Sequence, residues 1–257
     1  MCQNDIFFER ADENALTHLI MAGNMIRGGI PMGIGNLVNL EILALCYNNL
    51  GGTLPNVLGK LQKLQALYLN DNKFFGSIPS SLGNLTALIM LYMENNKFEG
   101  RIPPSLGNCQ HLLSLNISNN NLTGTIPKQV IGLSSLSIYL DMSQNFLVGA
   151  LPFEVGNLIH LSELYLSNNR LSGKIPTTLD TCHSLERLYL EGNSFQGTIP
   201  QSLKKLRGLD EIDLSRNKFS ANIPKFDEKL MSLKHLNISY NDLEGEVPSE
   251  GIFENAS

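Results

Sequence analysis

The sequence is poor in the features that mark several large protein classes. Charged residues make up only 17% of the 257 residues, and Lys and Arg are scattered singly in a chain of formal net charge -5. A nucleic-acid partner requires a clustered basic surface, so this class is excluded. No run approaches the roughly 18 consecutive apolar residues of a membrane-spanning helix. Hydrophobic residues make up 42% of the chain, which is enough for a buried core.

Motifs that carry chemistry are also missing. The five histidines are scattered, and none stands beside cysteines or carboxylates at the spacing of metal ligands. The sequence contains neither a phosphate-binding glycine loop nor a nucleophile elbow. We therefore expect no catalytic residue, no cofactor and no metal site, so this chain is not expected to be an enzyme.

A 24-residue repeat dominates the sequence. Ten of the eleven prolines, from Pro31 to Pro248, follow one another in steps of 24 residues with a single step of 25. An asparagine stands seven residues before each of them, and a glycine stands three residues before nine of them, Ala221 being the exception. A fixed period of this length predicts a solenoid in which each repeat forms one coil. Ten such units fill residues 16–248.

Each conserved position of the unit has a physical reason. Leu67 and Leu69 alternate with a period of two, which predicts a short strand with one buried face. Asn72 would turn its amide inward and satisfy the backbone of adjacent coils. The glycine frees the backbone for a tight turn, and the proline begins a short helical turn on the outer face. The one extra residue falls within 133–139 and predicts a bulge just before a strand.

The unit L-x-x-L-x-L-x-x-N-x-L-x-G-x-I-P, as at 64–79, resembles the plant-specific class of leucine-rich repeats. Segments 81–86, 133–137 and 245–257 are similar, more narrowly, to ectodomains of plant receptor-like Ser/Thr kinases of the subfamily that includes pathogen-pattern receptors. This resemblance implies an α/β leucine-rich-repeat solenoid, curved into a right-handed superhelix. The parallel β-sheet would line the concave face, and short 3-10 or helical turns would form the convex face.

The two ends depart from that family. Its members carry paired cysteines and usually a tryptophan before the first repeat, and a second cysteine pair after the last; here Trp is absent and the four Cys pair in neither place. Cys109 and Cys182 occupy equivalent positions roughly 14 Å apart, too far for a disulfide. We expect residues 1–15 to be a partial repeat or ragged end without a cap, and 249–257 to leave the last repeat without its cap. The expected chain is thus a fragment, without signal peptide, transmembrane helix or kinase domain.

The resemblance also implies a function. It indicates an extracellular ligand-recognition module of a receptor-like kinase in immune or developmental signalling, at the outer face of the plasma membrane, with a peptide or protein ligand. A short-ectodomain co-receptor kinase would join it, and segments outside this chain would supply the membrane anchor and the Ser/Thr kinase. One alternative is a secreted or kinase-less binding protein, such as an inhibitor of microbial wall-degrading enzymes. Another is a remnant that does not fold.

Residues that flank the buried strand leucines are expected on the concave face, and all seven tyrosines fall there. Tyrosine combines a large contact area with a polar tip, which suits binding, although it also favours strands for structural reasons. The predicted glycosylation sites are Asn84, Asn116, Asn121, Asn237 and Asn255. Sugars on Asn116 and Asn237 would flank repeats six to nine, where we expect a peptide-like ligand. The predicted ligand-binding residues are Tyr139, Tyr165, Tyr189, Glu163, Arg187, Glu191, Asp213 and Arg216, with Tyr68 and Tyr92 in a second window over repeats two to four.

Overall fold

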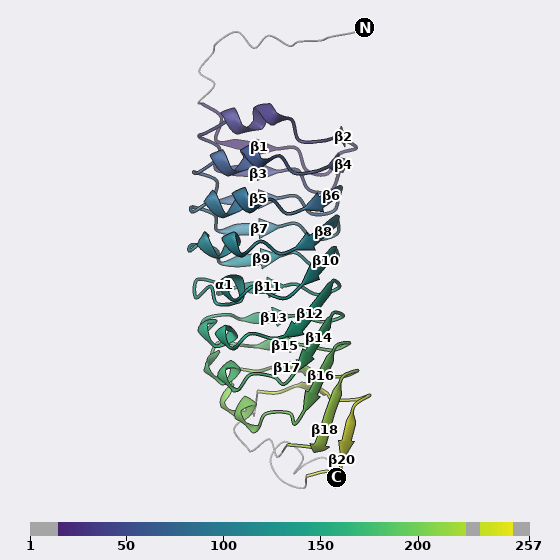
Figure 1. Ribbon diagram of the computed structural model, residues 1–257. Helices are drawn as coiled ribbons and strands as arrows, with labels where there is room; N and C mark the ends of the chain where they lie inside the picture. Colours follow the sequence, from purple (N-terminus) through teal and green to yellow (C-terminus); the bar gives the residue numbers. More distant parts are fainter. Residues whose placement is uncertain (1–14, 225–231, 249–257) are drawn as a thin grey trace.

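The computed structural model describes residues 15–224 and 232–248 of the chain. Each repeat forms one coil that contains two short strands, and the coils stack into an elongated solenoid (Figure 1). This architecture confirms the predicted leucine-rich-repeat fold. The predicted end segments, 1–15 and 249–257, lie almost wholly outside the described residues.

The first strand of every coil joins a ten-stranded parallel sheet. The middle residue is fully buried in the strands between the two ends, while its neighbours on the strand are partly exposed in several of them, as Glu163 and Tyr165 are on either side of Leu164. This is the sheet that the alternating leucines predict. Its strands in spatial order are β1 (His18–Ile20), β3 (Ile42–Ala44), β5 (Ala66–Tyr68), β7 (Met90–Tyr92), β9 (Ser114–Asn116), β11 (Tyr139–Asp141), β13 (Glu163–Tyr165), β15 (Arg187–Tyr189), β17 (Glu211–Asp213) and β19 (His235–Asn237).

A second ten-stranded parallel sheet follows the asparagine of each repeat, where the sequence predicted only a turn. The repeat glycine, for example Gly100 with φ +76°, belongs to these strands or comes directly after them and sharply bends the chain. This second sheet adds to the predicted parallel sheet and does not replace it. The strands are β2 (Arg27–Gly28), β4 (Asn49–Gly52), β6 (Lys73–Ser77), β8 (Lys97–Arg101), β10 (Asn121–Gly124), β12 (Phe146–Ala150), β14 (Arg170–Gly173), β16 (Ser194–Gly197), β18 (Lys218–Asn222) and β20 (Asp242–Glu244).

Short helical turns close the coils, as predicted. Each begins directly after one of the ten repeat prolines, which serves as N-cap in extended conformation, as Pro79 does with φ -71° and ψ 136°. The fixed φ of proline and its missing N–H suit this position. The turns are η1 (Met32–Asn36), η2 (Asn56–Lys60), η3 (Ser80–Asn84), η4 (Pro104–Asn108), α1 (Lys128–Ile131), η5 (Phe153–Asn157), η6 (Thr177–Thr181) and η7 (Gln201–Lys205).

The core is one continuous column of leucines with two phenylalanine stacks. Phe74 and Phe98 lie 6.2 Å apart between ring centroids, and Phe195 and Phe219 lie 6.3 Å apart. All four rings are fully buried. Burial of a phenylalanine contributes roughly 1.5–3 kcal/mol, so these neighbouring pairs hold adjacent coils together.

The repeat asparagine joins each coil to its neighbours, as predicted. The amide nitrogen of Asn120 donates to the carbonyl oxygens of Met93, Ile117 and Ser118 at 3.1, 3.2 and 2.9 Å. Its amide oxygen accepts the backbone N–H of Phe98 at 2.9 Å. Asparagine supplies the two donors and the acceptor that these buried backbone groups require, because its amide carries both kinds of group.

The extra residue lies where the sequence placed it, directly before β11. The carbonyl oxygen of Leu113 accepts the N–H groups of both Ser137 and Ile138, at 3.2 and 3.1 Å. Tyr139 then pairs with Ser114, so the sheet keeps its register. Ile138 absorbs the extra length, and its side chain is 45% exposed.

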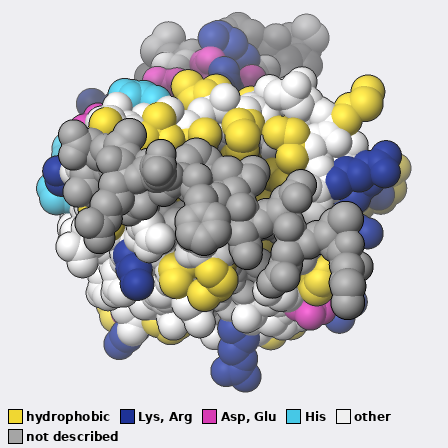
Figure 2. All heavy atoms as spheres, turned by 90° about the horizontal axis from the view of Figure 1, so that it is seen from above, with side chains coloured by type: hydrophobic (Ala, Val, Ile, Leu, Met, Phe, Trp, Pro, Cys, Tyr) yellow, Lys and Arg dark blue, Asp and Glu magenta, His cyan; other side chains and the backbone are white. Residues whose placement is uncertain are grey.

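The coil at the N-terminal end exposes part of its apolar surface. Figure 2, viewed along the solenoid, shows hydrophobic side chains on this end face. Ile20, Met25 and Met32 belong to this first repeat and are 64, 86 and 64% exposed. None of the helices in the described part of the chain combines the length and the apolar character that crossing a membrane requires.

Candidate ligand-binding face

The side of the first sheet that faces away from the core is called the open face here. It presents two parallel columns of side chains, one on each side of the buried leucines. The leading column holds the first residue of each strand, for example Glu163 of β13 and Arg187 of β15. The central column holds the last residue, for example Tyr165 and Tyr189. Adjacent strands pair in register, so residues of one column are direct neighbours. The predicted site residues therefore meet along the stack rather than along the chain.

Three tyrosines of repeats six to eight lie in contact, and we call them the tyrosine ladder: Tyr139, Tyr165 and Tyr189. The rings of Tyr139 and Tyr165 meet edge to face with centroids 5.5 Å apart. Those of Tyr165 and Tyr189 are stacked at 5.0 Å with an angle of 13° between their planes. All three side chains are partly exposed, so the ladder forms an aromatic strip on the open face.

Carboxylates fix the hydroxyl ends of this ladder. The hydroxyl of Tyr165 donates to Glu163 Oε2 at 2.8 Å, and the hydroxyl of Tyr189 donates to Glu211. Arg187 pairs with Glu163, and its Nε lies 3.7 Å from Glu211 Oε1. Burial, followed by the bond to Glu211, raises the pKa of Tyr189 to about 12. These groups satisfy one another, so the rings are held before any ligand arrives.

Glu211 was missing from the sequence prediction. It lies in the leading column next to Arg187, with which it pairs in the parallel ladder. Its position in the same column as Glu163 and Arg187 was the signal that could have identified it.

The remaining predicted residues of this window contact residues outside the ladder. Ser167 Oγ donates to Glu191 Oε2 at 2.7 Å, and Asn237 Nδ2 donates to Asp213 Oδ2 at 2.8 Å. The guanidinium group of Arg216 lies over the ring of Tyr240, 5.2 Å from its centroid.

The second predicted window contains a smaller aromatic pair. The rings of Tyr68 and Tyr92 meet edge to face at 5.4 Å. Tyr68 donates to Met90 Sδ at 3.4 Å, and the hydroxyl of Tyr92 lies 3.0 Å from Ser114 Oγ. This pair is separated from the tyrosine ladder by repeat five, whose central-column residue is Asn116.

Two further carboxylates lie near these windows: Glu94, which belongs to the second window in the sequence as well, and Asp141, which was not predicted. Glu94 follows β7 and has one carboxylate oxygen with neither solvent exposure nor a hydrogen-bond partner. Burial, with smaller contributions from the charges of Asp71 and Asp141, raises its pKa to about 7. Asp141 accepts the hydroxyl of Tyr139 at 3.1 Å and the backbone N–H of Ser143 at 2.8 Å. Glu94 Oε2 therefore lacks a hydrogen-bond donor, whereas both carboxylate oxygens of Asp141 have one.

The glycosylation motifs occupy different environments. Asn84 and Asn121 are exposed, whereas Asn116 is only 7% exposed. The amide of Asn116 donates to the Tyr139 hydroxyl at 3.1 Å, and its oxygen accepts the Ser118 hydroxyl at 2.8 Å. The picture of a sugar projecting from Asn116 over the open face thus does not fit this geometry. Asn237 is partly exposed, and the fifth motif, Asn255, lies outside the described residues.

The described part of the chain contains no cluster of three or more side chains that could bind a metal ion. Cys109 and Cys182 are buried, and burial raises the pKa of their thiols to about 11 and about 12. Both thiols remain free, as the sequence predicted from their separation.

The sequence matches models of a known repeat family. Models of the leucine-rich repeat match residues 38–98 and 159–219, 15–37 and 111–133, and 229–246, which together are well over half of the chain. No curated protein sequence gives a significant match.

Solved structures give the same fold. The Arabidopsis receptor kinase HAESA, in complex with the peptide hormone IDA and the co-receptor SERK1, is 34% identical with a TM-score of 0.80 over 90% of this chain and 43% of that chain. The ectodomain of the membrane receptor kinase GASSHO1/SCHENGEN3 from Arabidopsis thaliana, in complex with CASPARIAN STRIP INTEGRITY FACTOR 2, is 33% identical with a TM-score of 0.60, over 91% and 34%. A plant ice-binding protein is 26% identical with a TM-score of 0.75, over 92% and 76%.

This chain spans less than half the length of the two receptor chains. The same 24-residue unit recurs in its two parallel sheets, in the hydrogen bonds of its repeat asparagines and in the segments that match the family models. The chain belongs to the leucine-rich-repeat proteins, and its fold is that of plant receptor-kinase ectodomains.

Proposed function

We propose that the chain is the extracellular peptide-recognition module of a plant receptor-like kinase, in defence or developmental signalling. The tyrosine ladder carries this proposal, because it is an ordered aromatic strip on the open face of the sheet. Rigid tyrosines give large contact area at low entropic cost. The HAESA structure is a complex with a peptide hormone, which supports a peptide ligand for this chain.

In this proposal the ligand lies along repeats six to nine, over Tyr165 and Tyr189, with Asp213 and Arg216 beside it. The ion-paired residues Glu163, Arg187 and Glu211 lie in the leading column, and the two glutamates hold the hydroxyl groups of Tyr165 and Tyr189. Fixed rings reduce the ordering cost of binding, because less side-chain freedom is lost when the ligand arrives. A peptide laid across several strands would contact one or two side chains from each repeat.

The proposed partners follow from the receptor family. A co-receptor kinase with a short ectodomain would join near the C-terminal repeats once the peptide is bound. The HAESA structure, which contains the co-receptor SERK1, supports a partner of this kind. The membrane anchor and the Ser/Thr kinase would belong to segments outside this chain. A secreted protein without a kinase would use the same face, and the transcript downstream of codon 257 distinguishes the two.

A selection from a phage-displayed library of linear 12-residue peptides tests the proposal. Peptides enriched on the wild-type chain are expected to lose binding to the Tyr165→Ala/Tyr189→Ala variant. Phe75→Ala is the matched control, since Phe75 is an aromatic residue of the second sheet that is 50% exposed. Enriched peptides that bind the double variant as tightly as the wild type would contradict the proposal.

A further inference from the structure

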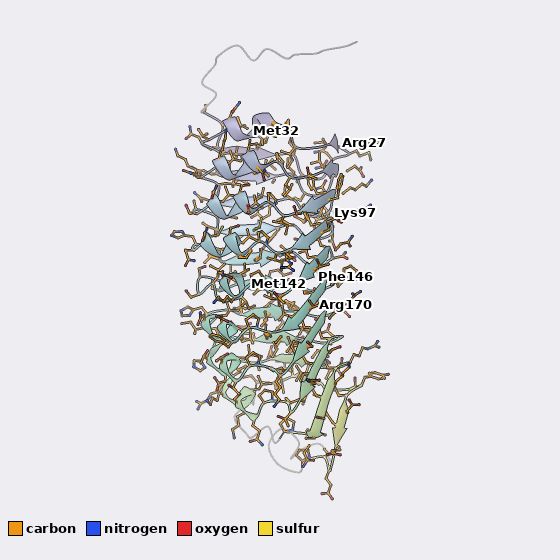
Figure 3. All side chains as sticks on the ribbon, viewed as in Figure 1. Arg27, Met32, Lys97, Met142, Phe146 and Arg170 are labelled. Carbon is orange, nitrogen blue, oxygen red and sulfur yellow. The ribbon has the colours of Figure 1, made fainter. Side chains whose placement is uncertain are left out.

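The second sheet forms a basic side of the solenoid. On its strands from β6 to β18, the exposed side chains that point away from the core include five cations and a single carboxylate, Glu99. A sixth cation, Lys174, follows β14 directly and is also exposed. Figure 3 shows Lys97 and Arg170 on this side of the solenoid. We call this surface the basic sheet face, and its cations are Lys73, Lys97, Arg101, Arg170, Lys174 and Lys218.

The cations of the basic sheet face are not neutralised by their neighbours. Within the described residues, none of the six forms an ion pair with Asp or Glu. The guanidinium group of Arg170 lies over the ring of Phe146, 4.9 Å from its centroid. The carbon chain of Lys174 lies against Gly197 of the next coil, where an added Cβ would meet Lys174 Cε at 3.3 Å. Apolar contacts thus position these two side chains along the sheet, while their charges stay available to a partner.

The open face of the first sheet is acidic instead. Its side chains include carboxylates such as Glu163, Glu191 and Asp213, and one of its arginines, Arg187, is already paired with Glu163. Two sheets of opposite charge direct an anionic partner away from the open face and toward the basic sheet face. Long-range electrostatics thus favours the second sheet as the binding surface for an anion.

The cations are spread along the stack of coils. Lys73 lies on β6 and Lys218 on β18, six strands apart in the sheet order. At about 4.8 Å per strand, this separation is roughly 29 Å along the solenoid. A small anion reaches only a part of this length, whereas a linear polyanion contacts several cations at once and gains avidity. A glycan on Asn121, a predicted glycosylation site on β10, would leave three of the cations on each side of it.

The uncharged side chains between the cations indicate the kind of polyanion. Phe75 is the register partner of Lys97, and Phe146 lies beside Arg170, so an exposed ring accompanies a cation twice. Hydroxyl and amide groups lie on the same strands, and they include those of Thr123, Ser172, Ser194, Gln196, Ser220 and Asn222. Lysine and serine are depleted in protein–protein interfaces, which argues against an acidic protein. A sugar ring carries hydroxyl groups around its edge and apolar C–H groups on its faces, so it matches both the hydrogen-bonding groups and the aromatic rings.

We propose that the basic sheet face binds a linear acidic polysaccharide, a chain of sugar rings that carry carboxylates, which lies along the stack from β6 to β18. Its carboxylates contact Lys97, Arg170 and Lys218, and its rings pack on Phe75 and Phe146. Serine and threonine side chains of the same strands bond its hydroxyl groups. This site lies on a different sheet from the tyrosine ladder, so the inference goes beyond peptide recognition and does not depend on it.

A labelled oligomer of about ten galacturonic acid units tests the inference by fluorescence anisotropy, with the unglycosylated wild-type chain at 20 and 200 mM NaCl. We expect binding at the lower salt concentration and weaker binding at the higher one, because salt screens exposed charges. The methyl ester of the same oligomer keeps the rings but lacks the charges, so it should bind about tenfold more weakly or not at all. A peptide of ten glutamates carries the charges without the rings and should also bind more weakly than the oligomer.

The variant Lys97→Gln/Arg170→Gln/Lys218→Gln should weaken binding of the galacturonic acid oligomer about tenfold or more. The matched control, Lys60→Gln/Lys128→Gln/Arg207→Gln, also removes two lysines and one arginine, but from the helical turns and the residues that follow them. It should change affinity by less than about twofold. Circular dichroism verifies that both variants are folded.

A second pair of variants tests the contact with the sugar rings. Phe146→Ala should weaken binding of the oligomer about threefold, because the ring no longer packs on a sugar. Phe153→Ala is the control, since Phe153 is 69% exposed but lies on the turn η5, and it should leave the affinity unchanged.

Equal losses in the two charge variants, or binding of the methyl ester as tight as that of the acidic oligomer, would overturn the inference. Equally tight binding of the glutamate peptide, unaffected by Phe146→Ala, would also overturn it and would show that the sheet binds acidic protein segments instead. If none of the three probes binds, the acidic polysaccharide is wrong, while the proposed peptide recognition stands or falls with the phage selection on the tyrosine ladder.

Discussion

The side-chain amide of Asn145 donates a hydrogen bond of 3.1 Å to the carbonyl oxygen of Ile117, one repeat earlier. It also donates to Met142 and Ser143, while its oxygen accepts the N–H of Leu122. Asn145→Ala leaves these buried backbone groups without partners. Since an unsatisfied buried group costs about 1–3 kcal/mol, we expect the free energy of unfolding to fall by roughly 3 kcal/mol. Urea unfolding followed by circular dichroism measures this loss.

The same substitution in the first repeat serves as the control. Asn24 is exposed and donates only to Met21 and Ala22 of its own coil. Water can replace both bonds, so Asn24→Ala should cost less than about 1 kcal/mol. Equal losses for the two variants would show that the asparagine stabilises the fold through bonds within its own coil and not through the bond to the preceding coil.

A second prediction concerns the one repeat that lacks its glycine. Ala221 has φ +66°, in the left-handed region that glycine occupies at this position of the other described repeats, as Gly197 does with φ +78°. An L-residue with a Cβ atom is disfavoured there by about 1–2 kcal/mol. Ala221→Gly should therefore raise the free energy of unfolding by about 1 kcal/mol, a gain reduced by the greater freedom of glycine in the unfolded chain.

The reverse substitution in another repeat isolates the backbone effect. At Gly100, an added Cβ would meet nothing nearer than the Cβ of Ser77 at 3.8 Å, so Gly100→Ala introduces no clash. Its loss should be about 1 kcal/mol, similar in size to the gain at Ala221. A loss in both variants would contradict the explanation by left-handed strain.

Much of the fold could be predicted because the repeat gives each residue type one task. The buried pair Leu67 and Leu69 and the inward Asn72 follow from periodicity and hydrogen-bonding capacity alone. The second sheet could not be predicted in this way. Strands such as β16 (Ser194–Gly197) are short and end in glycine, which is depleted in strands, and parallel pairing with the coils above and below stabilises them.

The candidate site could also be predicted only in part from the sequence. The exposed position of Tyr165 and Tyr189 followed from the alternation of the strand, and the structure confirms that they are partly exposed. The importance of Glu94 and Glu211 depends on neighbours that are 22 or more residues away in sequence and only one or two strands away in space. One sequence shows which residues share a column, but side-chain orientation decides which of them touch.

A third prediction uses the pKa of Glu94, which burial raises from 4.5 to about 7. Between these values the folded chain binds a proton at Glu94 that the unfolded chain has already released, so stability falls as the pH rises through this window. Glu94→Gln removes the effect, because its side chain is neutral throughout. We expect the variant to melt at a higher temperature than the wild type at pH 8, with a smaller difference at pH 4.

Thermal unfolding at several pH values measures this difference. Glu99→Gln is the control, since Glu99 is exposed on the second sheet and should leave the pH dependence of the melting temperature unchanged. A difference between Glu94→Gln and wild type that is the same at pH 4 and pH 8 would show that Glu94 is not protonated in the fold.

A fourth prediction concerns the glycosylation motifs. If the chain is secreted from a eukaryotic host, glycopeptide mass spectrometry should find high occupancy at the exposed Asn84 and Asn121. Occupancy at Asn116 should be low in the folded product. A sugar there would replace one amide hydrogen and displace the bond to Tyr139, within a side chain that is 7% exposed. Chains modified at this nitrogen must open the tyrosine contact and should fold less efficiently.

Single substitutions separate the sites. Asn84→Gln should remove one glycan mass from the secreted protein, whereas Asn116→Gln should leave the mass pattern unchanged. Occupancy at Asn116 as high as at Asn84, in protein with a native melting temperature, would contradict the buried arrangement. Such a result would also place a glycan on the open face between the two tyrosine windows.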